Sequence, residues 1–247
     1  MIIHAPVPVA RLTIVIPALN EADALPDTLR SLEIQAAEPP FEVILADGGS
    51  QDGTAALFLN ITRGWPPGQR TARVVACPHP GRGEQMNAGA SVAAGDALLF
   101  LHADTQLPPG ATQAILGALS EPAVVGGGFR HSFSETGLDL RVISLYATAR
   151  SLLSGIHYGD QAIFARRTIF EALGGFAAGP LFEDLRLSRG LRTRGRVVTL
   201  PLSVSTSARR LRRGGVARTA ARFAWLKLRH ALGADPSRLK GRYPDVR

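Results

Sequence analysis

Two stretches, LTIVIPALNE (residues 12–21) and FEVILADGGSQDGT (residues 41–54), decide the fold that this sequence predicts. Each begins with a short run of apolar and β-branched side chains, which is typical of a fully buried strand. Each run then stops at polar residues. Buried strands that alternate with helical segments belong to parallel sheets with helices on both faces. The two stretches therefore indicate an α/β fold.

The same alternation continues outward from these stretches. Strands are expected at residues 12–17, 41–46, 72–76, 97–101 and 197–200, and helices at residues 22–36, 51–62, 84–94, 138–153 and 215–232. The pattern weakens after residue 101, and residues 126–129 (GGGF) open a stretch that we expect to be irregular. We predict one domain, residues 1–210, with a mostly parallel central sheet, and a basic helical C-terminal extension, residues 211–247.

Composition places the chain among globular proteins. Its 247 residues suit one large α/β domain, and 45% hydrophobic with 19% charged residues excludes intrinsic disorder. The most apolar stretch, residues 88–101, contains Asp96 and is too short to cross a bilayer. Residues 1–10 lack the features of a signal peptide, and the single cysteine, Cys77, excludes a disulfide framework. We therefore expect a cytoplasmic protein.

Charge is divided unevenly along the chain. Residues 1–165 carry 9 basic and 15 acidic side chains, whereas residues 166–247 carry 19 basic and 5 acidic ones. Only Lys227 and Lys240 are lysines, and every other basic side chain is an arginine, whose planar guanidinium suits bidentate contact with phosphate. Two interpretations stay open: a biased genome composition with solvated helix faces, or a surface that binds anions.

Polar side chains follow three predicted strands at their carboxyl ends. Asn20 and Glu21 follow the first strand, residues 47–54 the second, and His102 and Asp104 the fourth. Ligands of open α/β sheets bind at this edge, hard divalent cations prefer oxygen ligands, and a diphosphate needs its charge neutralised. The polar residues at these strand ends predict a binding site for a metal ion and a sugar nucleotide.

Each exit also has a plainer explanation. DGGSQDGT (residues 47–54) could be only a turn, Asn20-Glu21 only the start of a helix, and His102 only a satisfied polar residue at a strand end. Their occurrence after successive strands favours the functional interpretation.

Five motifs, taken in order, resemble those of bacterial family-2 glycosyltransferases of the GT-A fold: PALNE (17–21), DGGSQDGT (47–54), GRGEQMNAG (81–89), HAD (102–104) and ED (183–184). The resemblance covers residues 12–210. The later GDQAIFARR, GGF, PLFED and TSARR are similar to a narrower bacterial branch that is associated with radical-SAM or selenoprotein gene neighbourhoods. The resemblance implies an inverting, metal-dependent, hexosyltransferase-type enzyme. Such an enzyme moves a sugar from a nucleotide-sugar donor, expected to be a UDP-sugar, to an unidentified acceptor that could be lipid-linked.

The resemblance also implies roles for individual residues. The nucleotide would be bound by Pro17, Asn20, Glu21, Asp47, Gly49, Arg82 and His102. Asp104, aided by His102, would hold a divalent cation, Mg²⁺ or Mn²⁺. Asp184, with Glu183 beside it, would be the base that deprotonates an acceptor hydroxyl as the hydroxyl attacks the anomeric carbon.

Two smaller groups complete the expected site. Gly159, Asp160 and Gln161 would lie on the acceptor side, although a tight turn beneath the site explains them equally well. Arg209 and Arg210 would contact phosphates. Position 102 departs from the family pattern, because an aspartate usually stands where this chain has His102. It is left open whether His102 contacts a ribose or a metal.

The predicted C-terminal helix places Arg218, Arg222 and Arg229 on one face with Trp225. Such a face suits an anionic membrane, which would make the protein peripheral on the inner face of the plasma membrane, while a solvated helix docked on the body is the alternative. No motif indicates specific nucleic-acid binding.

Three other functions compete with glycosyl transfer. A sugar-phosphate nucleotidyltransferase would need a glycine- and lysine-containing loop where PALNE stands, and a dinucleotide-dependent oxidoreductase would need GxGxxG. A non-catalytic basic protein that binds nucleotides or anions would leave the acidic strand exits unexplained.

Overall fold

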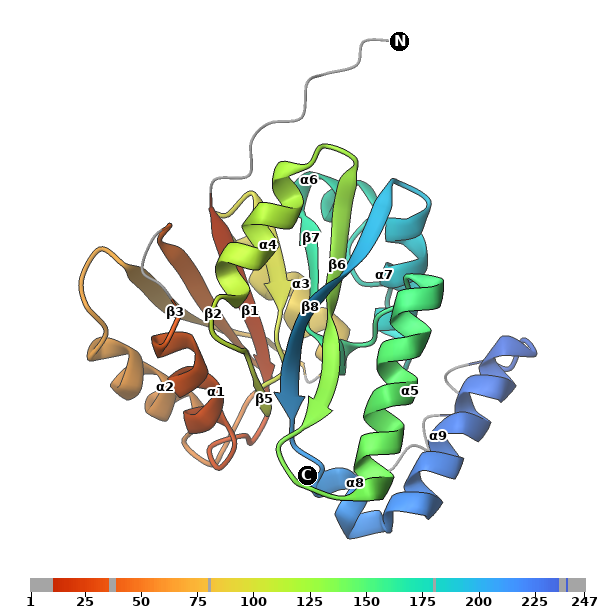
Figure 1. Ribbon diagram of the computed structural model, residues 1–247. Coiled ribbons are helices and arrows are strands. Elements are labelled where there is room, and N and C mark those ends of the chain that lie inside the picture. The colour runs from red at the N-terminus through yellow and green to blue at the C-terminus, as the bar shows by residue number, and fades with distance from the viewer. Residues whose placement is uncertain (1–10, 36–38, 80, 180, 236–238, 240–247) are drawn as a thin grey trace.

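The computed structural model describes residues 11–35, 39–79, 81–179, 181–235 and 239 (Figure 1). Two expectations fall elsewhere. The absence of a signal peptide concerns residues 1–10, and the end of the C-terminal extension concerns residues 236–238 and 240–247, so both lie outside the described residues.

The described strands form one mixed sheet in the order β3-β2-β1-β4-β7-β6-β8-β5. Their bounds are β1 Leu12–Ala18, β2 Phe41–Asp47, β3 Arg70–Ala76, β4 Ala97–Phe100, β5 Thr105–Gln106, β6 Val124–Phe133, β7 Ile163–Arg166 and β8 Arg196–Thr206. The first four strands are mutually parallel, and β6 is parallel to β8, whereas β7 and the short β5 run antiparallel to their neighbours. The prediction of a mostly parallel sheet is confirmed.

Helices cover both faces of the sheet (Figure 1). Their bounds are α1 Leu25–Glu33, α2 Thr54–Arg63, α3 Arg82–Ser91, α4 Ala111–Ser120, α5 Leu138–Ser154, α6 Arg167–Ala172, α7 Glu183–Arg192, α8 Arg209–Gly214 and α9 Val216–Ala231, with a 3₁₀ turn, η1, at Gly159–Gln161. Helices α1, α2 and α4 bury apolar side chains on one face, and α3, α6 and α7 on the other. Helix α5 packs on β6 and on α8.

The apolar runs quoted above form the centre of this sandwich. All seven residues of β1 and all seven of β2 are buried. Along β1, Ile14 and Ile16 face the layer of α1 and α2, while Val15 faces the layer of α3. Burial of each such side chain contributes roughly 1.5–3 kcal/mol. The continuous apolar pattern is therefore what gives β1 and β2 their central place.

The expectation of an irregular stretch at residues 126–129 was wrong, because these residues lie within β6. Glycine usually weakens a strand, but here the neighbouring chain approaches too closely for a side chain. A Cβ at Gly127 would lie 2.0 Å from the carbonyl oxygen of Val198, and one at Gly128 would lie 2.6 Å from the ring of His157. The glycines allow β6 to pack between β7 and β8.

Element ends differ from the predictions by one to three residues for most segments. The largest differences are that β8 runs from Arg196 to Thr206 and that the sequence pattern did not predict β5, β6, β7, α4, α6, α7 or α8. Among the described residues, no helix combines the length and apolarity needed to cross a membrane.

Gly89, in the GRGEQMNAG motif, provides a test of the packing between α3 and β1. A Cβ at this position would lie 2.4 Å from Cγ1 of Val15, a fully buried side chain. We expect Gly89→Ala to lower the free energy of unfolding by about 1–3 kcal/mol, because the clash must be relieved inside a close-packed core. Urea denaturation measures the change.

Gly117→Ala is the matched control. Gly117 is also helical, but it is exposed and nothing would lie within 4 Å of its Cβ. This change should stabilise the protein by about 0.4–1 kcal/mol, because alanine restricts the unfolded chain. Equal effects of the two substitutions would contradict the packing described.

Candidate functional site at the carboxyl edge of the sheet

The loops after β1 and β2 are joined to each other by hydrogen bonds. The N–H of Asn20 donates to Ser50 Oγ (2.9 Å), and Asn20 Oδ1 accepts the N–H of Gln51 (2.8 Å). The N–H of Glu21 donates to Thr54 Oγ1 (2.9 Å). Asn20 has a left-handed backbone, with φ of 55°. The two motifs thus form one unit, and Asn20 acts within it as a brace.

Sequence reasoning missed Gln85, which fixes the ends of the same two strands. Its buried Nε2 donates to the carbonyl oxygens of Ala18 (2.6 Å) and Ala46 (2.9 Å). The signal that could have revealed it was its place inside GRGEQMNAG, next to the predicted Arg82. Gln85 couples α3 to both loops.

Three predicted nucleotide residues lie at the ends of β1 and β2. Pro17 is buried within β1, and Asp47 is the last residue of β2. The carboxylate of Asp47 accepts a hydrogen bond from Ser50 Oγ (2.5 Å). Gly49 follows with φ of 93°, a conformation that favours glycine. These residues therefore lie where the loops after β1 and β2 begin.

A carboxylate cluster lies beside these loops. Nη2 of Arg209 is 2.5 Å from Glu21 Oε2 and 3.8 Å from Asp104 Oδ2. Arg209 is brought here because β5 pairs with β8, through Thr105 and Thr206, and because the N–H of Ser207 donates to the carbonyl oxygen of Asp104 (3.1 Å). Burial raises the pKa of Glu21, and the bond from Arg209 partly offsets that effect. One cation therefore serves two carboxylates.

Glu183 and Asp184 open α7 and form a second acidic group. Glu183 is buried, with Nη1 of Arg82 3.6 Å from its Oε1. Asp184 accepts the N–H of Gly159 (2.9 Å) and that of Leu185 (2.7 Å). Burial raises the pKa of both carboxyl groups, and the negative charge of Asp184 adds to the effect on Glu183. Raised carboxyl pKa values suit groups that accept protons.

His102 is buried beside the η1 turn and is influenced by the charge of Arg82. Burial, and secondly the charge of Arg82, lower its pKa to about 3, so the imidazole is neutral near pH 7. Its Nε2 is buried without a hydrogen-bond partner in the part of the chain that the structure describes. A Cβ at Gly159 would lie 2.4 Å from this nitrogen, so the ring packs closely against the η1 turn.

The η1 turn holds the predicted acceptor residues. The side chain of Gln161 points inward, where its Nε2 donates to the carbonyl oxygen of Phe129 (3.0 Å) and to Ser151 Oγ (3.0 Å). Asp160 Oδ2 is 3.7 Å from Nε2 of His131. Burial opposes ionisation of Asp160, but nearby positive charges, first that of His131, outweigh it and lower the pKa. Gln161 thus anchors the turn, while Asp160 contributes charge.

Helix α9 also reaches this turn, which sequence reasoning did not foresee. The ring of Tyr158 has the guanidinium carbon of Arg150 at 3.9 Å and Nζ of Lys227 at 4.1 Å from its centre. The ring of Phe182, immediately before Glu183, stacks on that of His230 at 4.3 Å. Lys227 could have been noticed as one of only two lysines in the chain.

Arg210 follows Arg209 in α8, and its charge acts on both Glu21 and His102. The structure therefore brings Arg82, His102, Arg210 and the two acidic groups into one electrostatic neighbourhood at the carboxyl edge.

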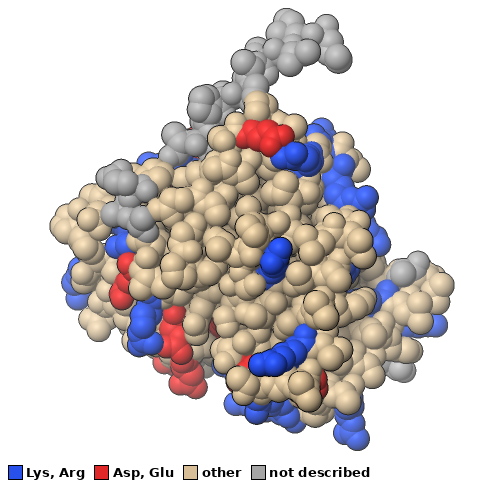
Figure 2. Space-filling view, in the orientation of Figure 1, with Lys and Arg blue, Asp and Glu red and all other residues tan. Residues whose placement is uncertain are grey.

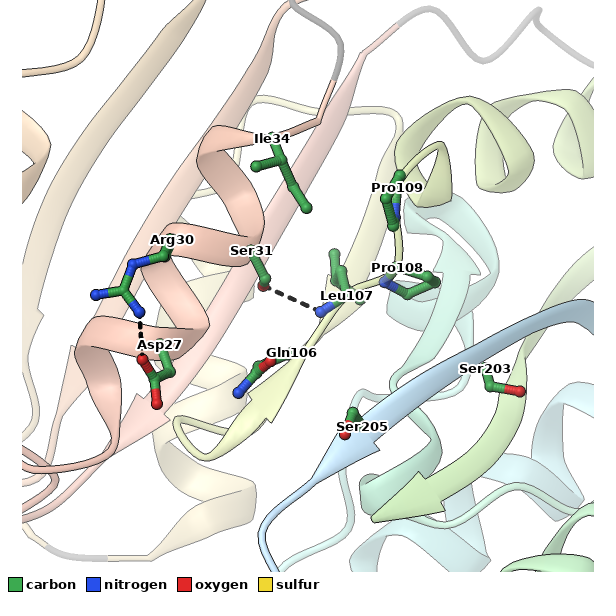
Figure 3. Close-up of a pocket in the computed structure, with 10 residues that line it drawn as sticks. All are labelled: Asp27, Arg30, Ser31, Ile34, Gln106, Leu107, Pro108, Pro109, Ser203 and Ser205. Atoms are coloured by element: carbon green, nitrogen blue, oxygen red, sulfur yellow. Dashed lines mark hydrogen bonds and ion pairs between the residues drawn. The ribbon is translucent and has the colours of Figure 1, made fainter. Parts of the chain in front are cut away.

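A separate hollow of about 360 Å³ lies between α1 and β8 (Figure 3). It is lined by Asp27, Arg30, Ser31, Ile34, Gln106, Leu107, Pro108, Pro109, Ser203 and Ser205. Ser31 Oγ accepts the N–H of Leu107 at its wall (3.0 Å). The residues that line this hollow include none of the residues described above at the carboxylate edge, so the two regions are distinct.

The residues fit a cation that is shared with a ligand. Within the described ranges, no three histidine, cysteine, aspartate or glutamate side chains gather as a metal cage. Asp104 nevertheless presents a part-exposed carboxylate beside Glu21. Mg²⁺ is commonly held by one or two carboxylates together with substrate phosphates. The donor set therefore suits a cation that arrives with a diphosphate.

The described sheet and its helices have the GT-A fold. The chain superimposes on the mannosyltransferase PcManGT from Pyrobaculum calidifontis, solved with GDP-Man and Mn²⁺, with a TM-score of 0.65 and 21% identity over 97% of this chain and 70% of that one. It also resembles glucosyl-3-phosphoglycerate synthase from Mycobacterium tuberculosis, solved with Mn²⁺, UDP and phosphoglyceric acid (TM-score 0.61, 22% identity, 92% and 80% covered).

Sequence comparison gives the family. Residues 13–174 match the profile described as Glycosyl transferase family 2, and the chain belongs to that family. Undecaprenyl-phosphate 4-deoxy-4-formamido-L-arabinose transferase from Pseudomonas aeruginosa is 29% identical over 174 residues, which cover 68% of this chain and 50% of the relative. The chain spans about half the length of the curated relatives it matches, or less.

His157, next to Tyr158, makes stability depend on pH. Burial, and secondly the charge of Arg150, lower its pKa from 6.5 to about 4, and its Nε2 pairs with Thr199 Oγ1 (2.9 Å). Because the unfolded chain takes up the proton first, stability present above pH 6.5 is lost as pH falls towards 4. We expect this residue to account for about 2 kcal/mol of the loss between pH 7 and pH 5.

Urea denaturation at both pH values, on wild type and His157→Gln, measures this loss. The variant should lose about 2 kcal/mol less than wild type on acidification, whatever its stability at pH 7. His79→Gln, at an exposed histidine, should leave the acid loss unchanged. An unaltered acid loss in His157→Gln would contradict the assignment.

Proposed function

We propose that this protein transfers a sugar from a nucleotide-sugar donor, a UDP-sugar, to an acceptor hydroxyl with inversion at the anomeric carbon. The observation that carries the proposal is the pairing of two acidic groups at one sheet edge. One is the Glu21–Asp104 cluster beside Arg209, and the other is the buried Glu183–Asp184 pair with raised pKa values. The GT-A fold and the family membership support this reading.

The residues at the first group suit the nucleotide. The braced loops after β1 and β2 hold Asp47 and Glu21 at the sheet edge, where both can contact the nucleoside. Arg209 and Arg210 can meet the diphosphate, because arginine forms strong charge-assisted bonds to phosphate oxygens. A Mg²⁺ or Mn²⁺ held by Asp104 would neutralise the charge that develops on the leaving diphosphate.

The second group suits the acceptor. An acceptor oxygen attacks the anomeric carbon, the bond from that carbon to the diphosphate oxygen breaks, and the acceptor proton passes to the carboxylate of Asp184. The nucleoside diphosphate leaves with the electron pair. The two N–H groups that bond Asp184 keep its carboxylate oriented towards the η1 turn, and Glu183 with Arg82 sets the local charge.

Arg209 has a different partner in the free nucleotide site than in the site with a bound diphosphate. Without a ligand, it neutralises Glu21 and approaches Asp104. We propose that the diphosphate competes for this guanidinium, which frees the Asp104 carboxylate for the cation. Arg209 would thereby keep an acidic edge stable until the nucleotide arrives.

Asp184→Asn tests the base. The amide keeps the size of the side chain but cannot take a proton, so transfer should fall by roughly 10²–10⁴-fold. Release of UDP or GDP would be measured with UDP-glucose, UDP-N-acetylglucosamine and GDP-mannose as donors. Phosphoglyceric acid, which carries a hydroxyl group, would serve as the acceptor probe.

Glu171→Gln is the matched control, since Glu171 is an exposed carboxylate paired with Arg167 on α6. It should retain wild-type turnover, and both variants should bind nucleotide as wild type does. Transfer by Asp184→Asn at the wild-type rate would remove Asp184 as the base, and loss of nucleotide binding would assign it a structural role.

Asp104→Asn and Arg209→Gln test separately the proposed cation ligand and the proposed phosphate ligand of the nucleotide site. Calorimetric titration of UDP and GDP, with and without Mn²⁺, should show that Asp104→Asn abolishes the Mn²⁺-dependent gain in affinity. Arg209→Gln should weaken binding roughly tenfold in both conditions, because a charge-assisted bond to phosphate is lost. An unchanged Mn²⁺ effect in Asp104→Asn would contradict the cation assignment.

A further inference from the structure

Helix α5 presents an apolar face to solvent. Leu138, Leu145 and Leu153 are 80%, 71% and 89% exposed, and Val142 and Tyr146 are also exposed. The spacing of these residues places them on one side of the helix, while Leu140, Ala147 and Ser151 are buried on the other. The helix is 17 residues long, about 25 Å, so the stripe runs along its whole length.

Helix α9 adds exposed apolar and aromatic side chains next to α5. The exposed side chains are Trp225 and Leu228 within α9 and Leu232 directly after it. Helix α9 packs on α5 and α8 through a small core that includes Leu140, Leu211 and Phe223. We call the exposed faces of α5 and α9 together the α5–α9 surface. Apolar patches of this kind mark contacts with proteins or membranes.

The charge around this surface is strongly positive. Residues 209–232 contain eight arginine or lysine side chains and no aspartate or glutamate. Arg218, Arg222 and Arg229 are exposed on α9. Figure 2 shows a largely uncharged face over α5, with basic side chains gathered along the lower margin below it. The surface therefore combines the exposed apolar side chains of α5 with the exposed arginines Arg218, Arg222 and Arg229 of α9.

We propose that the α5–α9 surface binds a bilayer containing anionic lipids, with α5 supplying the side chains that enter the interface and α9 the charge that attracts it. Negatively charged headgroups complement the basic flank, and the acyl region accepts the leucines of α5. A second copy of this chain would bring the same basic flank against itself, so charge favours the bilayer as the occupant.

The α5–α9 surface is connected to the candidate site, so a membrane contact there would affect the site. Arg150 of α5 and Lys227 of α9 lie on the ring of Tyr158, which immediately precedes the η1 turn. A bilayer on this surface would border the side of the site where Asp184 lies. The membrane contact itself does not rest on the proposed transferase activity, and it is tested without turnover.

Sedimentation with vesicles tests the proposal. Full-length protein should bind vesicles of phosphatidylcholine with 30% phosphatidylglycerol, and bind pure phosphatidylcholine at least tenfold more weakly. The pair Leu145→Gln and Leu153→Gln should weaken binding to the mixed vesicles roughly tenfold. The matched control is Ile34→Gln with Leu59→Gln, because those residues are also exposed and apolar but lie near α1 and on α2.

The charge contribution is measured separately. Neutralising Arg218, Arg222 and Arg229 to glutamine should weaken binding roughly tenfold or more and reduce its dependence on salt. Circular dichroism and urea denaturation check that the variants remain folded.

Three results would overturn the proposal. The first is equal binding of the α5 pair and its control, and the second is equal binding to neutral and anionic vesicles. The third is a wild-type dimer that the α5 pair converts to monomer in sedimentation velocity, which would assign the surface to a second copy of the chain.

Discussion

The ion pair of Arg209 with Glu21, and its approach to Asp104, is the interaction on which the site depends. Parallel strands deliver their polar exits to one edge, so β1 and β4 necessarily place two carboxylates near each other. Partly buried like charges raise each other's free energy unless a cation neutralises them. The cation comes from 188 residues further along the chain. The antiparallel pairing of β5 with β8 brings Thr206 opposite Thr105 and so places Arg209 close to Asp104.

The two acidic groups at this edge are held in different environments, and that difference permits different tasks. Glu21 and Asp104 are part-exposed and share a guanidinium, which suits exchange with a charged ligand. Burial raises the pKa of both Glu183 and Asp184, while two backbone N–H donors fix the Asp184 carboxylate and Arg82 lies 3.6 Å from that of Glu183. His102, which packs against the η1 turn, is a neutral ring near pH 7 and adds no charge to this edge.

The first half of the fold could be predicted from the sequence because β1 and β2 are buried on both faces. Strands in that position consist of uninterrupted apolar residues, which are easily recognised in a sequence. The motifs after those strands likewise predicted which residues would meet. The second half depends on long-range packing. The backbone at Gly127 and Gly128 lies too close to Val198 and His157 for a side chain. From the sequence alone, a run of glycines predicts an irregular segment instead of a strand. Gln85 and Lys227 act through partners distant in sequence, so no local pattern could assign their contacts.

The predicted boundary between a domain and a basic extension, at residues 210 and 211, falls inside α8. Beyond that point, Lys227 lies on Tyr158 and His230 stacks on Phe182, whose left-handed backbone, with φ of 65°, leads directly into Glu183. A bulky residue holds that conformation only when its surroundings stabilise it. Helix α9 is therefore part of what positions the acidic pair of α7, and a force that moves α9 acts on both the η1 turn and Glu183. The helix that carries the exposed arginines is thus also the helix that packs against the η1 turn and the start of α7.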